Sequence, residues 1–336
     1  MTFPSAGRLW RRRWTVVVAS SISMTHITGW LIISGALLVI FSVLVPSAPL
    51  QAQIRGVYPL GMSATNSGVT PDSGFTYSNS FLSYFRDELR GPNGEVLGIG
   101  RNSVLMDMNS LVWVKKKGVK VLRGALFSAS ATLPIANNSL TSDVEGALSG
   151  GGGLADSYYQ PLILGWRTKR AEIRAVYGFL APTGRFKAGA NNNVGSGYWT
   201  NCVSAGETFY LTSSKTTAIS AFEMYEFHGT QQGTNIHPGQ TFDLDYSVTQ
   251  TFPLEQDLRL QLGLAGYGQW QTTDKNGPIV TPAQAAAHYR VNALGFAANV
   301  ILPVRKASLG VKYFREFLTR STFQGYSLQI SGAITF

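Results

Sequence analysis

Charged side chains recur along this 336-residue chain at positions where apolar and polar residues alternate. Glu172 and Arg174 stand two residues apart, as do Asp243 and Asp245. This spacing places both members of a pair on one face of a strand, because strand side chains alternate between two faces. Such a row could line a watery passage and act on a permeating solute, or the charges could simply pair across it. The candidates for this lining are Glu172, Arg174, Asp243, Asp245, Arg259, Arg290, Lys312 and Glu316.

The motifs of common catalytic chemistry are incomplete. Residues 202–206 (Cys-Val-Ser-Ala-Gly) lack the first glycine of the turn that carries a nucleophilic serine. Residues 150–153 are glycines, but no Lys-Ser/Thr of a phosphate-binding loop follows them. His228, His237 and His288 have no metal-ligand spacing with a cysteine or with one another, and the single cysteine excludes a zinc ribbon or a disulfide framework. We therefore expect no catalytic residue, no metal site and no cofactor, and a protein that is not an enzyme.

The elements that position the charged residues are predicted to be strands. In residues 258–264 every second residue is leucine, and polar or small residues stand between them. The same alternation runs through residues 75–85, 307–313 and 326–336. A period of two over about ten residues, with turn residues between such segments, is typical of β-strands. One segment is ambiguous, because Glu223 and Glu226 fall on opposite faces, and we assign it no lining residue.

The connections between these segments alternate in length. Twelve segments begin near residues 74, 103, 119, 156, 170, 199, 216, 240, 257, 288, 305 and 323. Long connections are expected at 87–102, 133–155, 183–198, 229–239 and 272–287, and short ones near 116–118, 167–169, 213–215, 253–256 and 303–304. An even number of strands with this alternation is typical of a closed antiparallel transmembrane β-barrel with long outer loops and short periplasmic turns.

The barrel interpretation also explains the polarity of the two faces. Lipid offers the backbone no hydrogen-bond partner, so a spanning sheet must close on itself, with its apolar face toward lipid and its polar face inward. Charged residues make up 14% of the chain, against about 25% in globular proteins. A secreted soluble β-sandwich or β-helix is the alternative, but the polar face has few large aliphatic residues from which a sandwich could build a core.

The first 52 residues are predicted to be a cleaved signal peptide. A cluster of arginines at 11–13 precedes an uncharged apolar run at 30–45, and small residues follow up to Ala52. This is the order of charged region, apolar region and cleavage site in a secretory leader, although a retained membrane anchor is the alternative. Residues 53–73 are then expected to form a periplasmic or lumen-plugging segment, and residues 74–336 the barrel.

The net charge gives little support for nucleic-acid binding. It is +10 for the whole chain. Four arginines of the predicted leader (Arg8, Arg11, Arg12 and Arg13) leave 28 − 4 = 24 basic against 18 acidic residues, or +6. No Lys/Arg stripe accompanies this charge, so we expect no nucleic-acid partner.

The C-terminal strand carries a pattern that resembles the signal read by the outer-membrane barrel assembly machinery. The chain ends in phenylalanine, and apolar residues share its parity. The residues of this pattern are Tyr326, Leu328, Ile330, Ile334 and Phe336. We therefore expect assembly into the outer membrane, with its lipid and lipopolysaccharide as partners, as a monomer.

Several fragments together resemble the meta-pathway phenol degradation proteins, a family regarded as outer-membrane transporters. They occur in the family's order, at residues 151–156 (Gly-Gly-Gly-Leu-Ala-Asp), 160–166, 181–186, 237–246, 263–271 and 312–317. Ala155 replaces the second glycine of the family's Gly-Leu-Gly-Asp, and the early Pro-Pro-Gly is reduced to Tyr58-Pro-Leu-Gly61. The family defines no catalytic residues.

The resemblance implies a channel in the outer membrane of a Gram-negative bacterium for passive uptake of small hydrophobic or aromatic compounds such as phenol or toluene. Two alternatives stay open: an outer-membrane barrel enzyme, and a structural or adhesive barrel without transport. Twelve strands enclose a lumen wider than that of an eight-stranded barrel and narrower than that of a porin, so we expect a restricted path.

Overall fold

The computed structural model describes residues 55–142, 146–190 and 192–336. The predicted signal peptide, residues 1–52, lies outside these residues. No helix within them is long and apolar enough to cross a bilayer.

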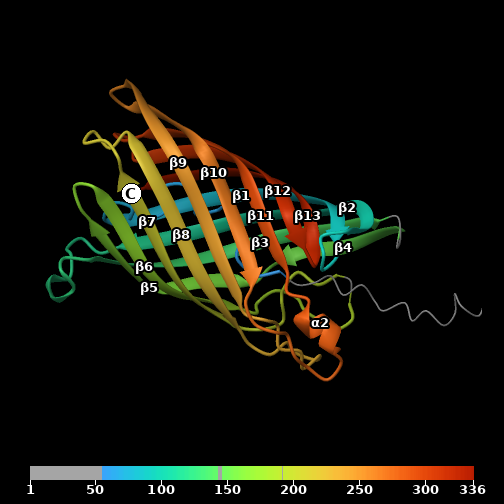
Figure 1. Cartoon of the computed structure of the whole chain (residues 1–336). Coiled ribbons are helices and arrows are strands. Elements are labelled where there is room, and N and C mark those ends of the chain that lie inside the picture. Colours follow the sequence, from blue (N-terminus) through green and yellow to red (C-terminus); the bar gives the residue numbers. More distant parts are fainter. Residues whose placement is uncertain (1–54, 143–145, 191) are drawn as a thin grey trace, which may run out of the picture. The chain divides into compact units, whose positions relative to one another are not determined.

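The described chain is almost entirely antiparallel β-structure (Figure 1). Its strands are β1 (Gly74–Arg90), β2 (Val96–Val114), β3 (Leu126–Ser142), β4 (Gly146–Leu154), β5 (Ser157–Arg167), β6 (Ala171–Ala181), β7 (Thr200–Tyr210), β8 (Thr217–His228), β9 (Thr241–Glu255), β10 (Leu258–Gln271), β11 (Arg290–Leu302), β12 (Ala307–Arg320) and β13 (Thr322–Thr335). Two short helices lie in connections: η1 (Lys120–Leu122) and α2 (Pro282–Ala286).

The strands form one closed sheet. Each strand from β5 to β13 pairs with the next, β13 pairs with β1, and β1 pairs with β2. The pairing of β2 with β3 closes the ring. One half of β3, Leu126–Thr132, pairs with β5, and the other half, Ile135–Ser142, pairs with β4. The thirteen strands therefore fill twelve positions around the barrel, since β4 and β5 share one.

The prediction of a closed antiparallel barrel of about twelve strands is confirmed, but some of its connections were placed wrongly. Residues 87–102, expected as a loop, belong largely to β1 and β2, and only residues 91–95 connect them. Most of residues 133–155 likewise lies in β3 and β4. Conversely, the connection expected near 116–118 extends over residues 115–125 and contains η1. These paired segments are rich in charged residues, serine and glycine, so their sequence resembles that of loops. Backbone pairing with neighbouring strands nevertheless holds them extended.

The two faces of the barrel have opposite polarity. On β7 and β8 the even-numbered residues are buried and mostly small or polar, among them Ser204, Thr208 and Ser220. Odd-numbered neighbours such as Val203, Phe209 and Ile219 are about half exposed. The polar face therefore points inward and the apolar face outward, as a barrel in lipid requires.

The C-terminal strand β13 follows the same rule. Leu328, Ile330 and Ile334 are exposed on the outer face, and Ser327 and Gln329, on the opposite parity, are buried. The backbone N–H of Phe336 donates to the carbonyl of Phe75, which fixes the end of the chain against the start of β1. The residues of the proposed assembly pattern thus share the outer face.

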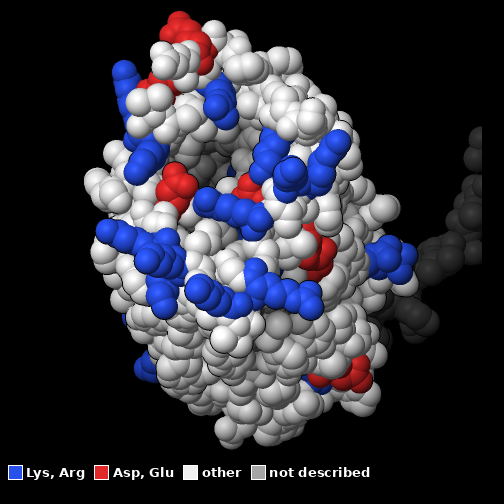
Figure 2. All heavy atoms as spheres, turned by 90° about the vertical axis from the view of Figure 1, so that its left-hand side faces the viewer, with Lys and Arg blue, Asp and Glu red and all other residues white. Residues whose placement is uncertain are grey.

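When the twelve barrel positions are counted from β1, the connections that follow the second, fourth, sixth, eighth and tenth positions lie at one end of the barrel. The C-terminus lies at the same end, which we call the short-turn end (Figure 1). The opposite, long-loop end carries residues 182–199, 229–240 and 272–289. Many lysines and arginines occupy the connections of the short-turn end: Lys115, Lys116, Lys117, Lys120, Arg123, Lys169, Arg170, Lys215, Arg305 and Lys306. Figure 2 shows basic side chains around a hollow at this end, with fewer acidic ones among them.

Residues 55–73, the N-terminal segment, pass through the interior of the barrel. Arg55 bonds to Thr322 and Glu316, which lie at the long-loop ends of β13 and β12. Nineteen residues after Arg55, Gly74 begins β1 at the short-turn end. The segment therefore crosses the lumen from one end to the other, and the barrel wall surrounds it.

Glycines allow the segment to lie directly on the wall. A Cβ atom on Gly206 of β7 would clash with the carbonyl of Ser67, and one on Gly68 would clash with the backbone oxygen of Glu172. Gly61 lies in a turn in which the Met62 N–H donates to the carbonyl of Pro59. Its φ is +82°, a backbone conformation that glycine adopts readily and that would be strained in a residue with a side chain. Glycine at these positions fixes how closely the segment and the barrel approach.

Replacing Gly206 by leucine should push residues 63–70 off the wall, because the new side chain fills the space of the Ser67 carbonyl. We expect faster amide exchange in this stretch while the barrel remains folded, measured by hydrogen-exchange mass spectrometry. Gly332→Leu is the matched control, since a Cβ there meets nothing nearer than 3.7 Å. Equal exchange in the two variants would contradict the close fit.

Candidate functional site

The candidate site is the lumen, where inward side chains of the barrel meet the N-terminal segment. Of the predicted lining residues, Arg174, Asp245, Lys312 and Glu316 bond directly to the segment. They belong to three strands, β6, β9 and β12, so the contacts come from opposite sides of the ring. 

Glu316 anchors the beginning of the segment through a buried ion pair. Arg55 Nη1 lies 2.7 Å from Glu316 Oε1, and the two side chains are 7% and 0% exposed. The same carboxylate accepts hydrogen bonds from Tyr267 Oη at 3.0 Å and from the N–H of Gly325 at 2.8 Å. Arg55 also donates to Thr322, at 3.1 Å. The Arg55 guanidinium and the Glu316 carboxylate thus neutralise each other inside the barrel, and further hydrogen bonds hold the carboxylate.

Asp245 and Lys312 hold the middle of the segment. Asp245 accepts hydrogen bonds from Tyr58 Oη at 2.6 Å, Gly61 N–H at 2.9 Å and Ser63 N–H at 3.0 Å. Lys312 Nζ donates to the carbonyls of Gly61 and Met62 at 2.8 and 2.6 Å. Acid and base therefore bind the donors and acceptors of a single turn.

Glu226 is a lumen residue that the sequence interpretation missed. It is fully buried and accepts the N–H groups of Val57 and Tyr58 at 2.9 and 2.7 Å. His228 Nε2 lies 3.2 Å from the same carboxylate. The alternation on β8 was ambiguous because Phe222 and Met224 share the inner face with Glu226. The polar His228, on the same parity, is the signal that could have resolved it.

The last part of the segment meets β5, β6 and β7. Arg174 Nε donates to Ser67 O at 2.7 Å, and Gly68 N–H donates to Thr208 Oγ1 at 3.0 Å. Arg167 donates to the carbonyls of Thr70 and Pro71. These bonds satisfy backbone groups that no strand pairs with.

Glu172 and Asp243 are also inside the barrel but bond mainly to the wall. Glu172 accepts from Tyr210 Oη at 3.0 Å and lies 3.3 Å from Lys215 Nζ. Asp243 is fully buried and accepts from Gln269 Nε2 at 2.7 Å. Glu172 thus pairs with a cation of the wall, whereas Asp243 bonds to a neutral amide.

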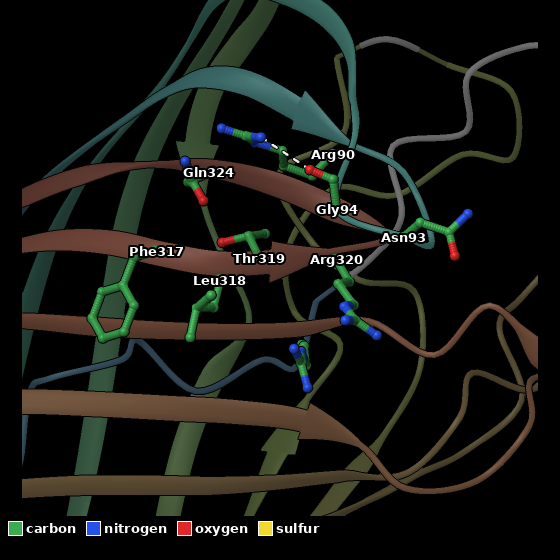
Figure 3. Close-up of a pocket in the computed structure, with 9 residues that line it drawn as sticks. Arg90, Asn93, Gly94, Phe317, Leu318, Thr319, Arg320 and Gln324 are labelled. Atoms are coloured by element: carbon green, nitrogen blue, oxygen red, sulfur yellow. Dashed lines mark hydrogen bonds between the residues drawn. The ribbon is translucent and has the colours of Figure 1, made fainter.

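The remaining two candidates lie near the ends of the barrel. Arg259 is exposed at the start of β10, near the short-turn end. Arg290, at the long-loop end, lines an open cavity of about 330 Å³ together with Arg90 and Arg320 (Figure 3). Its Nε is buried and has no hydrogen-bond partner among the described residues. The structure therefore does not bring these two arginines to the charges around the segment.

Comparison with known proteins places this barrel in a family. The chain matches the family described as "Putative MetA-pathway of phenol degradation" over residues 86–331. The chain belongs to this family. No curated protein sequence matches it significantly.

Two solved structures are similar to this member of the phenol degradation family. The COG4313 outer membrane channel from Pseudomonas putida F1 has a TM-score of 0.65 and 13% identity, covering 81% of this chain and 98% of that one. The β domain of the Bordetella autotransporter BrkA has a TM-score of 0.48 and 12% identity, covering 79% of this chain and all of that one. At this identity the first of them supports the fold, that of an outer-membrane barrel.

Removing the Arg55 side chain should destabilise the protein more than removing an exposed arginine. Arg55→Ala leaves the buried Glu316 carboxylate without its cation, and breaking a buried pair costs about 3–5 kcal/mol. Arg305→Ala, the control, breaks an exposed pair with Asp257, for which about 0–1 kcal/mol is expected. Urea unfolding in lipid vesicles, followed by tryptophan fluorescence, measures both losses. Equal losses would mean that Arg55 is not a structural anchor.

Proposed function

We propose that this protein is an outer-membrane channel for passive uptake of small hydrophobic or aromatic compounds in a Gram-negative bacterium. The observation that carries the proposal is the barrel lumen, whose polar wall binds a segment of the same chain that crosses it. A wall of this kind can also bind a solute when the segment moves. Membership in the phenol degradation family supports the substrate class.

The segment is held in a way that permits movement. Its contacts are hydrogen bonds, one buried ion pair and the packing of Tyr58, Leu60 and Ala64 on apolar clusters of the wall. The chain's one cysteine, Cys202, forms no disulfide. A single hydrogen bond contributes about 0.5–1.5 kcal/mol, and bonds to charged groups about 1.5–3. The strands pair only with one another, so displacement of the segment leaves the barrel closed. We infer that residues 55–73 act as a plug and that their displacement opens the path.

The ends of the barrel suit the two sides of an outer membrane. We assign the short-turn end to the periplasm and the long-loop end to the cell exterior, following the usual arrangement of such barrels. The arginines at the long-loop end, Arg90, Arg290 and Arg320, are suited to phosphate groups of lipopolysaccharide. The outer face of β13 is proposed to be read by the barrel assembly machinery, and we expect a monomer.

The enzyme alternative finds less support. His228, the histidine inside the barrel, bonds to Thr200 and Thr241 and lies beside Glu226, which itself binds the segment. No serine is bonded to it among the described residues. An adhesive barrel remains the second alternative, and substantial conductance would exclude it.

Uptake can be measured with the mature protein reconstituted in vesicles whose outer leaflet contains lipopolysaccharide, because small aromatics cross plain lipid unaided. We expect phenol or toluene to enter faster than in protein-free vesicles, with little entry of a sugar of similar size. A mature chain that lacks residues 53–73 should pass both solutes faster, since the plug is removed. Entry of neither solute through either protein would overturn the channel proposal.

A further inference from the structure

An apolar patch interrupts the polar inner wall of the barrel, and Tyr58 of the segment covers it. Cys202 of β7 and Phe222 and Met224 of β8 form a buried cluster, against which Tyr58 packs. Tyr158 of β5 and Leu180 of β6 complete its surroundings. Elsewhere the inner faces of these strands carry mainly small polar or charged side chains, such as Ser204 and Ser220. The patch is therefore distinct from the remaining inner faces of these strands.

The surroundings of Tyr58 match both parts of a phenol. Its ring lies against Phe222 with centroids 5.3 Å apart and planes at 34°, and aromatic pairs favour such contacts. Sulfur atoms of Met224 and Cys202 belong to the same cluster, and sulfur also packs well on aromatic rings. Its hydroxyl donates to Asp245 Oδ2 at 2.6 Å and accepts the N–H of Ser63 at 2.9 Å. A tyrosine side chain ends in a phenol, so the wall here binds a phenol that the chain itself supplies.

The groups that recognise this ring belong to the barrel and not to the segment. Phe222, Met224, Cys202 and Asp245 all lie on strands, whereas the Ser63 N–H, which donates to the Tyr58 hydroxyl, belongs to the segment. They keep their positions when the segment leaves. The vacated place would then offer an apolar slot for a ring and one carboxylate for a hydroxyl.

We propose that this place is a binding subsite for hydroxylated aromatic compounds and that Tyr58 occupies it until such a compound replaces it. This inference rests on the proposed channel function and narrows its substrate class from aromatics in general to phenols. It also links the substrate to the plug. Tyr58 is in the turn whose N–H groups Asp245 and Glu226 bind, so a phenol that takes the place of Tyr58 also loosens that turn.

The native thiol provides a direct test of the subsite, because Cys202 is buried in its wall. In the detergent-solubilised mature Tyr58→Ala protein, a small methanethiosulfonate should modify Cys202 faster than in the wild type. Phenol should then protect the thiol at about tenfold lower concentration than toluene, as expected for one hydrogen bond to a charged acceptor. The double variant Tyr58→Ala/Asp245→Ala should lose this preference and still be protected by toluene. Equal protection by phenol and toluene in Tyr58→Ala, or an unchanged preference without Asp245, would overturn the subsite.

Competition with Tyr58 is tested in the unaltered protein. Phenol, but not toluene, should speed amide exchange of residues 57–63, because their bonds to Glu226 and Asp245 break when the turn moves. Migration as a folded barrel in unheated electrophoresis verifies each variant. If phenol leaves the amide exchange of residues 57–63 unchanged, the proposal that phenol displaces Tyr58 is wrong.

These measurements do not depend on transport, so the two proposals fail separately. Protection of Cys202 that is selective for phenol, without uptake into vesicles, would support the subsite proposal and contradict the channel proposal. Uptake of aromatic compounds, with equal protection of Cys202 by phenol and toluene, would support the channel proposal and contradict the subsite proposal.

Discussion

The backbone's need for hydrogen bonds governs both sides of this barrel wall. In lipid every N–H and C=O must find a partner within the protein, and closure of the sheet through β2 and β3 supplies those partners. Closure then separates an outer face that must be apolar from an inner face that need not be. The inner face thus becomes the place where charged residues are tolerated, and this makes a polar lumen possible.

A narrow polar lumen raises a second problem of the same kind. Carboxylates such as Glu316, Asp245 and Glu226 are almost completely removed from solvent, and a buried charge without partners is costly. The N-terminal segment brings a guanidinium, a phenol and several backbone N–H groups to these three acids. Conversely, Lys312 and Arg174 accommodate carbonyls of the segment, which has no strand to pair with. The segment and the wall therefore satisfy each other's buried polar groups.

The features that follow from period two could be predicted from the sequence. The inward placement of Lys312 and Glu316 needs only the parity of a strand and the cost of charge in lipid. The strand boundaries at residues 87–102 and 133–155 could not be predicted in this way, because there the sequence of the paired backbone resembles that of loops. Glu226 was missed for a related reason, since the apolar patch on β8 obscures the polar parity. Arg55, the partner of Glu316, could not be predicted, because the two residues are far apart in the chain and no local pattern links them.

The family fragment that ends in Asp156 shows what a sequence motif can and cannot reveal. The Asp156 carboxylate accepts the N–H groups of Gly184 and Ser196 at 3.0 and 2.7 Å, which ties residues 182–199 to the junction of β4 and β5. Gly184 and Gly195 are in such close contact there that a Cβ on either would clash with the other. Ala155, which replaces the second glycine of the fragment, is buried at this junction. The fragment is thus explained by the anchoring of a connection at the long-loop end, whereas the charged residues of the lumen lie far apart in the chain. Resemblance through such motifs identifies the scaffold, whereas the proposed phenol subsite rests on the contacts around Tyr58.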